Sequence, residues 1–518
     1  MPEPSPQTEP DRTALNAPSL TFAPHPESTR ILQIACFVAF LMGVSVTLLH
    51  RPLAQPEGGD EAIWDYVAQC VVRGQAPYRD VVEIKSPLSA YLSAAAMVIG
   101  RSAGLRDVIA VRLLNALMVG SLSAVTLLVA ARYLHSLLAA CIACLIPLTS
   151  THFTEWMVTG TEPKLPMILF GLFSLLLIAK GKPFWAGFFS MLSCLCWQPG
   201  LMFAGVALLM FSRYLTSWRD LAAMKVLLGA VVPLAGLLLY FYSIGALADF
   251  WTWNVVYNLK VYAPETAKGL RETVGLLWRV SLRVFRLDLL LVALGVAGLI
   301  TFGIDRVKAR LIGGTTFKPS CLFRDAIVIL PLIYLAFCLI NFQSGPDLIP
   351  LFPFIGLFAG WTIVKLGGAR SGQRLARLPA AALVVLFSLI ILRSLIYNVE
   401  SDLKLQDQEQ AFEAISQVLG PDDRIYVHGT IEILVLLNRP NLNPYIFLDR
   451  GKDDWIAKRT PGGFRAIIDE MESLAPRVVA ISRTGKVAHR AELRQWVDDH
   501  YDQMEVPGYE GVYLRRQR

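Results

Sequence analysis

Long apolar runs, separated by short polar segments, dominate the chain between residues 31 and 397. A helix needs about 20 apolar residues to cross a bilayer, and somewhat fewer where it is tilted or packed against neighbours. About eleven runs meet that criterion: 31–49, 108–131, 136–150, 165–181, 184–198, 200–213, 223–244, 289–304, 326–342, 347–365 and 378–397. The pattern therefore predicts an α-helical polytopic protein that crosses a membrane many times.

A shorter apolar run at 88–99 decides the orientation of these spans. Cytoplasmic loops carry an excess of Lys and Arg. If the N-terminus is cytoplasmic and 88–99 does not cross, cations such as Arg132, Arg306 and Lys365 all fall in cytoplasmic loops. If the run crosses, they all move to the other side. The charge pattern therefore favours an interfacial or re-entrant helix at 88–99, with residues 50–107 and the C-terminus external.

The two ends of the chain differ from the apolar middle, residues 31–397. Residues 1–30 are rich in Pro and polar side chains, which predicts a disordered cytoplasmic arm. Residues 398–518 alternate short segments typical of strands and helices. Helices are expected at 405–419, 431–437, 464–474 and 490–500, and strands at 424–428, 478–482 and 511–514. This alternation predicts a small external α/β domain.

The composition supports a membrane protein and argues against other classes. Of 518 residues, 54% are hydrophobic and 17% are charged, whereas about 25% are charged in a typical soluble domain. The net charge of +7 comes from short cationic clusters between apolar runs, a pattern that indicates membrane orientation and not nucleic-acid binding. Gly-rich phosphate loops, Gly-x-Ser-x-Gly elbows and zinc motifs are missing from the sequence, so we expect no cofactor and no bound metal.

The first polar segment after the first span carries the candidate chemistry. It contains an acidic pair, Asp60 and Glu61, then a turn with Arg79 and Asp80, and then Lys85 at the edge of an apolar run. Sugar transfer from a lipid phosphate needs a base for the acceptor proton and positive charge beside the leaving phosphate. Asp60 as the base and Lys85 as the cation fit this scheme. The alternative is that the acidic pair only caps the following helix at its positive end.

Residues 249–288 form a second external segment with interfacial character. Its aromatic residues are typical of the belt where a protein meets lipid head groups. Arg279, Arg283 and Arg286 then recur at helical spacing on one face, which predicts an amphipathic helix lying on the membrane surface. These arginines either bind the phosphate of a lipid substrate or only face lipid head groups, and the sequence leaves both interpretations open.

Two polar residues at external span ends are further candidates for substrate binding. Glu162 precedes Pro163, and Gln198 precedes Pro199. An ionisable residue at the edge of an apolar segment is often functional. The alternatives are that Glu162 is an ordinary solvated loop residue and that Pro199 alone explains a helix break beside Gln198.

The stretch that follows the first span resembles the first external loop of GT-C-fold glycosyltransferases that use polyprenyl-phosphate-linked sugars. These include protein O-mannosyltransferases, lipid A aminoarabinose transferases and galacturonosyltransferases of lipopolysaccharide. In that family the loop runs Asp-Glu, Gly-x-x-Pro-Tyr-x-Asp and Lys-Pro-Pro-Leu, which appear here as Asp60-Glu61, Gly74-Gln-Ala-Pro77-Tyr78-Arg79-Asp80 and Lys85-Ser86-Pro87-Leu88. Ser86 replaces the first proline of the last segment and leaves the lysine in place.

Weaker matches extend the resemblance over about residues 30–400. They are Arg112-Leu-Leu-Asn115, Thr161-Glu162-Pro163, Trp197-Gln198-Pro199-Gly200 and Asp347-x-x-Pro350-Leu-x-Pro353. The third stands where the family has Lys-Gln-Pro-Gly, so a tryptophan replaces a lysine. The fourth lacks the aromatic or histidine residue that usually precedes it.

The resemblance implies a multi-span enzyme at the external face of a bacterial plasma membrane. It would transfer a hexose or pentose from a polyprenyl-phosphate donor to an envelope lipid, glycan or protein by inverting displacement, without a metal. The resemblance also implies that Asp60 is the catalytic base, with Glu61 beside it, and that Lys85 and Glu162 belong to the substrate cavity. The alternative is a transporter or flippase of a lipid-linked sugar, with a site reached alternately from both sides.

Overall fold

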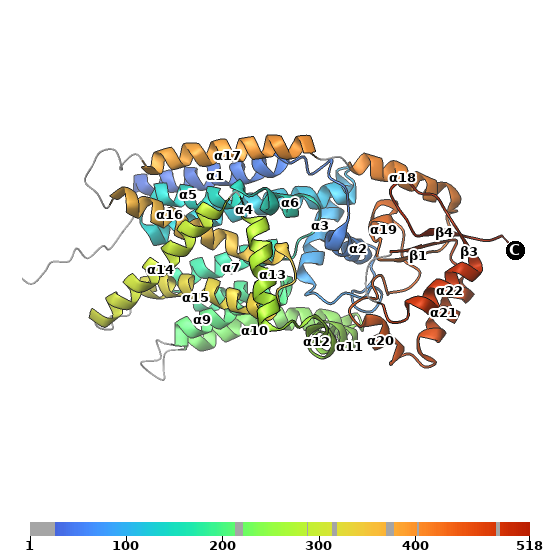
Figure 1. Cartoon of the computed structure of the whole chain (residues 1–518). Helices are drawn as coiled ribbons and strands as arrows, with labels where there is room; N and C mark the ends of the chain where they lie inside the picture. The colour runs from blue at the N-terminus through green and yellow to red at the C-terminus, as the bar shows by residue number, and fades with distance from the viewer. Residues whose placement is uncertain are drawn as a thin grey trace, which may run out of the picture.

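The computed structural model describes residues 26–212, 221–286, 288–312, 319–368, 378–400, 404–482 and 487–517. The predicted N-terminal arm lies outside the described residues except for 26–30, which begin the first helix. A bundle of long helices joins a smaller C-terminal domain at one end (Figure 1). The first helix begins at the end of the bundle that is remote from this domain.

The helices of the bundle match the predicted apolar runs. They are α1 (Pro26–Leu49), α4 (Asp107–Leu134), α5 (Leu137–Thr149), α6 (Thr151–Val158), α7 (Lys164–Ala179), α8 (Pro183–Cys196), η1 (Gln198–Gly200), α9 (Leu201–Ser212), α10 (Ala222–Ser243), α14 (Leu289–Ile312), α15 (Pro319–Ile340), η3 (Gly345–Leu351), α16 (Phe352–Gly368) and α17 (Leu378–Glu400). Within the described residues, six helices are long and apolar enough to cross a membrane. The helices α5 and α6 form a further apolar pair that bends by 68°. The chain is an integral, multi-pass membrane protein, as predicted.

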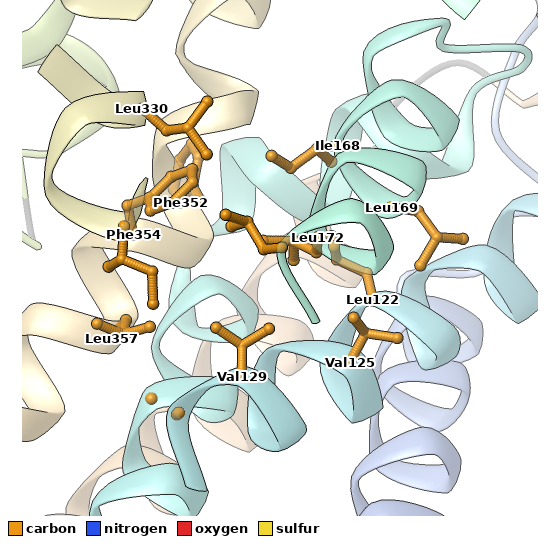
Figure 2. Close-up of a cluster of buried hydrophobic side chains, with 14 of the residues drawn as sticks. Leu122, Val125, Val129, Ile168, Leu169, Leu172, Leu330, Phe352, Phe354 and Leu357 are labelled. Atoms are coloured by element: carbon orange, nitrogen blue, oxygen red, sulfur yellow. The ribbon is translucent and has the colours of Figure 1, made fainter. Parts of the chain in front are cut away.

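Apolar side chains from α4, α7, α15 and α16 point toward one another in the centre of the bundle (Figure 2). Leu122, Leu172 and Leu330 belong to this cluster and are almost completely buried. Small residues bring neighbouring backbones close together, which favours helix packing in a membrane. A Cβ atom on Gly356 of α16 would lie 2.3 Å from the carbonyl oxygen of Ala143 on α5. The packed bundle provides a rigid support for the segments at its end.

The segment that follows α1 stays at the end of the bundle that faces the C-terminal domain. It forms α2 (Gly59–Val72) and α3 (Leu88–Ser102), which pack against each other and against α4. The first residue of α4, Asp107, accepts a hydrogen bond of 3.0 Å from Gln69 of α2. Next to it, Arg106 pairs with Glu409 of the C-terminal domain. The chain therefore leaves α1 and enters α4 at the same end of the bundle, and α3 lies at that end.

The second predicted external segment folds into four consecutive helices. They are α11 (Leu247–Phe250), the π-helix η2 (Trp251–Tyr262), α12 (Ala263–Thr266) and α13 (Leu270–Val284). A π-helix is rare and often marks a functional site. The predicted amphipathic helix corresponds to α13, which runs across the direction of the long helices (Figure 1).

The C-terminal domain contains a four-stranded sheet in the order β1-β2-β4-β3. Its elements are α18 (Leu405–Val418), β1 (Ile425–His428), α19 (Glu432–Leu437), α20 (Lys452–Ala457), α21 (Gly463–Leu474), β2 (Val478–Ile481), α22 (Arg490–His500), β3 (Tyr501–Gln503) and β4 (Val512–Arg515). β1 and β2 are parallel, whereas the other two pairs are antiparallel. The sequence predicted all of these except α20 and β3. β3 has only three residues, two of them exposed, so it leaves no alternating pattern.

Candidate active site

A pocket between the first external segment and the C-terminal domain brings the predicted base and the predicted cation together. It is open to solvent and, with the solvent space at its mouth included, encloses about 590 Å³. Its walls come from α2, the segment before α3, the π-helix and the C-terminal domain, which contribute among others Asp60, Trp64, Lys85, Tyr262, Arg450 and Lys452. These residues are far apart in the sequence, and the docking of the C-terminal domain onto the loop completes the pocket.

The acidic pair lies in the first turn of α2. Asp60 is exposed to the pocket, whereas Glu61 is partly buried. The helix N-terminus carries a partial positive charge that stabilises nearby carboxylates. The N-cap position is held by Gly58, which has no side chain to cap the helix. Both acids belong to the first turn of α2 and not to its N-cap, and Asp60 shares the pocket with Lys85, Arg450 and Lys452.

The backbone beside Lys85 is held by hydrogen bonds from three elements. The carbonyl oxygen of Ile84 accepts hydrogen bonds from the side-chain amides of Gln198 at 2.8 Å and Asn258 at 2.7 Å. The carbonyl oxygen of Lys85 accepts one from the hydroxyl of Tyr78 at 2.7 Å. Gln198, predicted to bind substrate, therefore anchors the lysine segment through its backbone.

The ammonium group of Lys85 has no acidic partner in the part of the chain that the structure describes. Neither an ion pair nor a hydrogen bond to a protein group is formed by this nitrogen there. The neighbouring carboxylate of Glu83 points back to the backbone, where it accepts hydrogen bonds from the N–H groups of Ile84 and Lys85 at 2.7 and 2.8 Å. The positive charge of Lys85 is therefore available to an anion in the pocket.

Glu162 belongs to a second charged group deeper in the bundle. It is buried, and its carboxylate accepts hydrogen bonds from the backbone N–H of Lys164 at 3.0 Å and from its ammonium group at 3.1 Å. The same ammonium lies 4.0 Å from the carboxylate of Asp347. The sequence did not single out Lys164, because a lysine that opens an apolar run is indistinguishable from an ordinary interfacial anchor.

Side-chain atoms of three acidic residues surround Gly160, behind the pocket. A Cβ atom on this glycine would lie 2.9 Å from Asp65 Oδ2, 2.9 Å from Glu61 Cβ and 3.4 Å from Glu57 Oε1. Burial, reinforced by the carboxylate of Glu162, raises the pKa of Glu61 to about 8. Burial also raises the pKa of Asp65 to about 6 and that of Glu57 well above its usual value. These three buried acids therefore hold their protons more tightly than ordinary carboxyl groups do.

Arg112 and Asn115 of α4, which belong to the predicted Arg-Leu-x-Asn motif, hold the two loops that carry these acids. The guanidinium group of Arg112 donates hydrogen bonds to the carbonyl oxygens of Gln55 at 2.6 Å and Thr159 at 2.8 Å. The amide of Asn115 donates to the carbonyl oxygens of Met157, at 3.1 Å, and of the residue that follows Thr159. Both side chains are buried and neither lines the pocket. Their hydrogen bonds therefore hold the loops in place and are not available to a substrate.

The C-terminal domain contributes two cations and one acid to the pocket. Arg450 and Lys452 flank Asp449, with nitrogen–oxygen distances of 3.4 Å in both pairs. Arg450 also donates hydrogen bonds to the hydroxyl of Tyr262 at 2.6 Å and to the side chain of Gln343 at 3.1 Å. The charged run that contains them was visible in the sequence, but nothing in it indicated which part of the membrane domain it contacts.

The comparisons with known proteins rest on structure alone. No family model matches the chain, and no curated protein matches its sequence. ArnT from Cupriavidus metallidurans matches in its apo state with a TM-score of 0.60 at 12% identity, over 94% of this chain and 96% of that one. The same protein bound to undecaprenyl phosphate matches with a TM-score of 0.57, at the same identity and coverage. The chain has the GT-C fold.

A second GT-C-fold protein matches over a similar length of this chain. It is the archaeal oligosaccharyltransferase AglB from Archaeoglobus fulgidus, in complex with an inhibitory peptide and a dolichol-phosphate. The TM-score is 0.56 at 13% identity, and the match covers 95% of this chain and 75% of AglB. The predicted fold class, a GT-C-like helical membrane protein with a small C-terminal α/β domain, is confirmed.

Some predicted substrate ligands of this GT-C-fold chain lie outside the pocket. Arg79 and Asp80 form an exposed ion pair of 3.0 Å, and Arg79 also donates a hydrogen bond of 2.8 Å to the carbonyl oxygen of Ile244. Arg279 and Arg283 are exposed on α13, which packs against α15 and η3. Among the described residues, no group of three or more His, Cys, Asp or Glu side chains could hold a metal ion.

Proposed function

We propose that this GT-C-fold protein is a membrane glycosyltransferase that moves a sugar from a polyprenyl-phosphate donor to an envelope acceptor. The observation that carries the proposal is the placement of Asp60 and Lys85 in one pocket at the end of the bundle. A carboxylate beside cations, next to a lipid-facing helical bundle, suits a substrate with a sugar phosphate head and an apolar tail.

The proposed reaction is a direct displacement at the anomeric carbon of the donor sugar. Asp60 takes the proton of the acceptor hydroxyl as its oxygen bonds to that carbon. The bond from the carbon to the phosphate oxygen breaks, and polyprenyl phosphate leaves with the bonding electrons. Lys85 stabilises the negative charge on the departing phosphate, together with Arg450 and Lys452 of the same pocket. One base is enough, because no glycosyl–enzyme intermediate is formed.

The structural neighbours support a lipid-phosphate donor, because one was solved bound to undecaprenyl phosphate and another in complex with a dolichol-phosphate. We place the reaction at the external face of a bacterial plasma membrane, where the cationic loops at the other end of the bundle would be cytoplasmic. The donor is a hexosyl or pentosyl lipid phosphate, and the acceptor is a lipid, glycan or protein of the envelope. Neither a cofactor nor a metal is needed for this chemistry.

The distribution of charge supports a transferase over a transporter of lipid-linked sugars. A transporter is expected to carry its ionisable site near the membrane midplane, reached from both sides in turn. Asp60 and Lys85 instead face a pocket formed with the C-terminal domain. Glu162 and Lys164 lie behind them and belong, in this proposal, to the deeper part of the substrate cavity. Arg279 and Arg283 guide the donor phosphate along the membrane surface.

Binding of undecaprenyl phosphate tests the donor class. Purified protein in lipid nanodiscs is titrated with this lipid, and wild type is compared with Lys85→Met. The loss of a charge-assisted contact to phosphate should weaken binding by about ten- to hundredfold. The matched control is Lys260→Met, which removes an exposed lysine of the π-helix that does not line the pocket. Equal affinity of wild type and Lys85→Met would contradict the proposal.

A further inference from the structure

Cations and aromatic rings alternate from the deeper charged group at Lys164 to the pocket, where Lys85, Tyr262 and Arg450 belong to the lining. The ammonium group of Lys164 lies 4.8 Å from the centre of the Trp197 ring, and that of Lys85 lies 5.8 Å from the same ring. Lys85 also lies 5.5 Å from the ring centre of Tyr262, and the guanidinium of Arg450 lies 5.3 Å from it. All four distances are within the range of a cation–π contact, about 6 Å. Lys85 is the middle cation, between two rings.

Both rings are held in place by contacts that do not involve Lys85. Trp197 is almost completely buried, and its ring packs edge-on against Tyr334 and Phe337, with centroid distances of 6.5 and 6.0 Å. Tyr262 is the last residue of the π-helix, and its hydroxyl accepts the hydrogen bond from Arg450. Neither ring can turn away freely when the lysine between them binds a ligand.

The partners of Lys85 and Lys164 differ in a way that matters for anion binding. Lys164 is neutralised by Glu162 at 3.1 Å. In the part of the chain that the structure describes, Lys85 has the two aromatic faces as its partners and no carboxylate. A carboxylate would have to be displaced before a phosphate could bind. An aromatic face attracts a cation more weakly and leaves its charge uncompensated.

We infer that Trp197 and Tyr262 are positioning residues for Lys85. Their faces hold the ammonium group in a fixed place without a counter-ion, so that a phosphate group meets a charged and pre-oriented donor. The inference rests on the proposed donor class. The sequence pattern that the chain resembles has a lysine in the place of Trp197, so the ring is a feature of this chain.

Fluorinated tryptophan at position 197 tests the contact directly, because each fluorine weakens the negative potential of the ring face and hardly changes its size. Tryptophan with zero, one, two or three fluorines is incorporated at this single position, and undecaprenyl phosphate is titrated into the protein in nanodiscs. We expect the Kd to rise steadily along the series, to roughly 2- to 30-fold at its end. The same series at Trp185, an exposed ring of α8, should leave the Kd unchanged.

Two further variants separate this inference from the proposed function. Tyr262→Phe keeps the aromatic face but loses the hydrogen bond from Arg450, and it should bind the lipid more tightly than Tyr262→Leu, which should bind as weakly as the trifluorinated Trp197 protein. If Lys85→Met weakens binding but the fluorinated series at Trp197 is flat, the positioning role is wrong and the donor class stands. If Lys85→Met leaves binding unchanged, both the proposed function and this inference are wrong.

Discussion

The guanidinium group of Arg112 lies 2.9 Å from the carboxylate of Glu57, and both side chains are completely buried. The same group donates a hydrogen bond of 2.8 Å to the carbonyl oxygen of Pro52. Because Arg112 stands near the start of α4 and also holds Thr159, one side chain fixes the two loops that frame the acids of the site. The geometry of the candidate site therefore depends on a residue that does not line the pocket.

Replacing Arg112 with methionine should lower the free energy of unfolding by about 3–5 kcal/mol, because it leaves the Glu57 carboxylate and several carbonyl groups buried without partners. The measurement is unfolding in mixed micelles. The control is Arg465→Ala, which removes an exposed ion pair with Asp469 and should change stability by less than about 1 kcal/mol. Similar losses for the two variants would refute the structural role of Arg112.

Gly160→Ala should disturb the acidic cluster. The added methyl group would lie 2.9 Å from Asp65 Oδ2 and from Glu61 Cβ, so one of these side chains must move, at a cost of about 1–3 kcal/mol. We expect lower stability and lower transfer activity together. Gly205→Ala in α9 is the control, because a methyl group there meets no atom within 4 Å and should stabilise the helix by up to about 1 kcal/mol. Equal stability of the two variants would contradict the packing around Gly160.

The pKa of Glu61 predicts a pH-dependent stability. Burial raises this pKa from 4.5 to about 8, so the folded protein keeps a proton between these values that the unfolded chain releases. The free energy of unfolding should therefore fall as the pH rises from about 5 to 8, by at most about 1.4 kcal/mol per pH unit from this group, and level off above 8. Glu61→Gln should show a shallower fall. Parallel pH profiles of the two proteins would contradict the protonated state of Glu61.

Arg279 and Arg283 of α13 and Arg286, which follows the end of that helix, should act together on donor capture. Each cation contributes only about 1 kcal/mol toward an anionic lipid surface, so single Arg→Ala changes at Arg279, Arg283 or Arg286 should be mild. The triple change should raise the donor Michaelis constant strongly in reconstituted bilayers and leave turnover at saturating donor unchanged. If the triple variant keeps the donor dependence of wild type, these arginines only anchor α13 at the interface.

A local sequence pattern was enough to predict that Asp60 and Lys85 lie near each other in the candidate site. Asp60 and Lys85 lie in one polar segment between apolar runs, so their proximity follows from the length of that segment and the position of the membrane. The seven predicted elements of the C-terminal domain followed from alternation and turn residues in the same way. Such patterns depend on neighbours along the chain and need no knowledge of the tertiary contacts.

The rest of the site depends on contacts between distant segments. Arg450 reaches the pocket only because the C-terminal domain docks on the first loop, for example through the 2.9 Å hydrogen bond from the N–H of Val82 to the carbonyl oxygen of Pro444. Gln198 was predicted to bind substrate, but its amide holds the Ile84 carbonyl. The π-helix has the same apolar and polar residues as an interfacial α-helix, so its wider turn could not be predicted.

In the proposed reaction, Asp60 acts as the base of a sugar transfer to an envelope acceptor. The most direct measurement is mass spectrometry of envelope glycolipids and glycoproteins from cells in which this gene is deleted and then complemented with wild type or with Asp60→Asn, at matched levels of membrane-inserted protein. We expect a sugar-modified species that wild type restores and Asp60→Asn does not, because loss of a general base costs at least about a hundredfold in rate. Restoration of that species by Asp60→Asn to the wild-type level would contradict the role of Asp60 as the base.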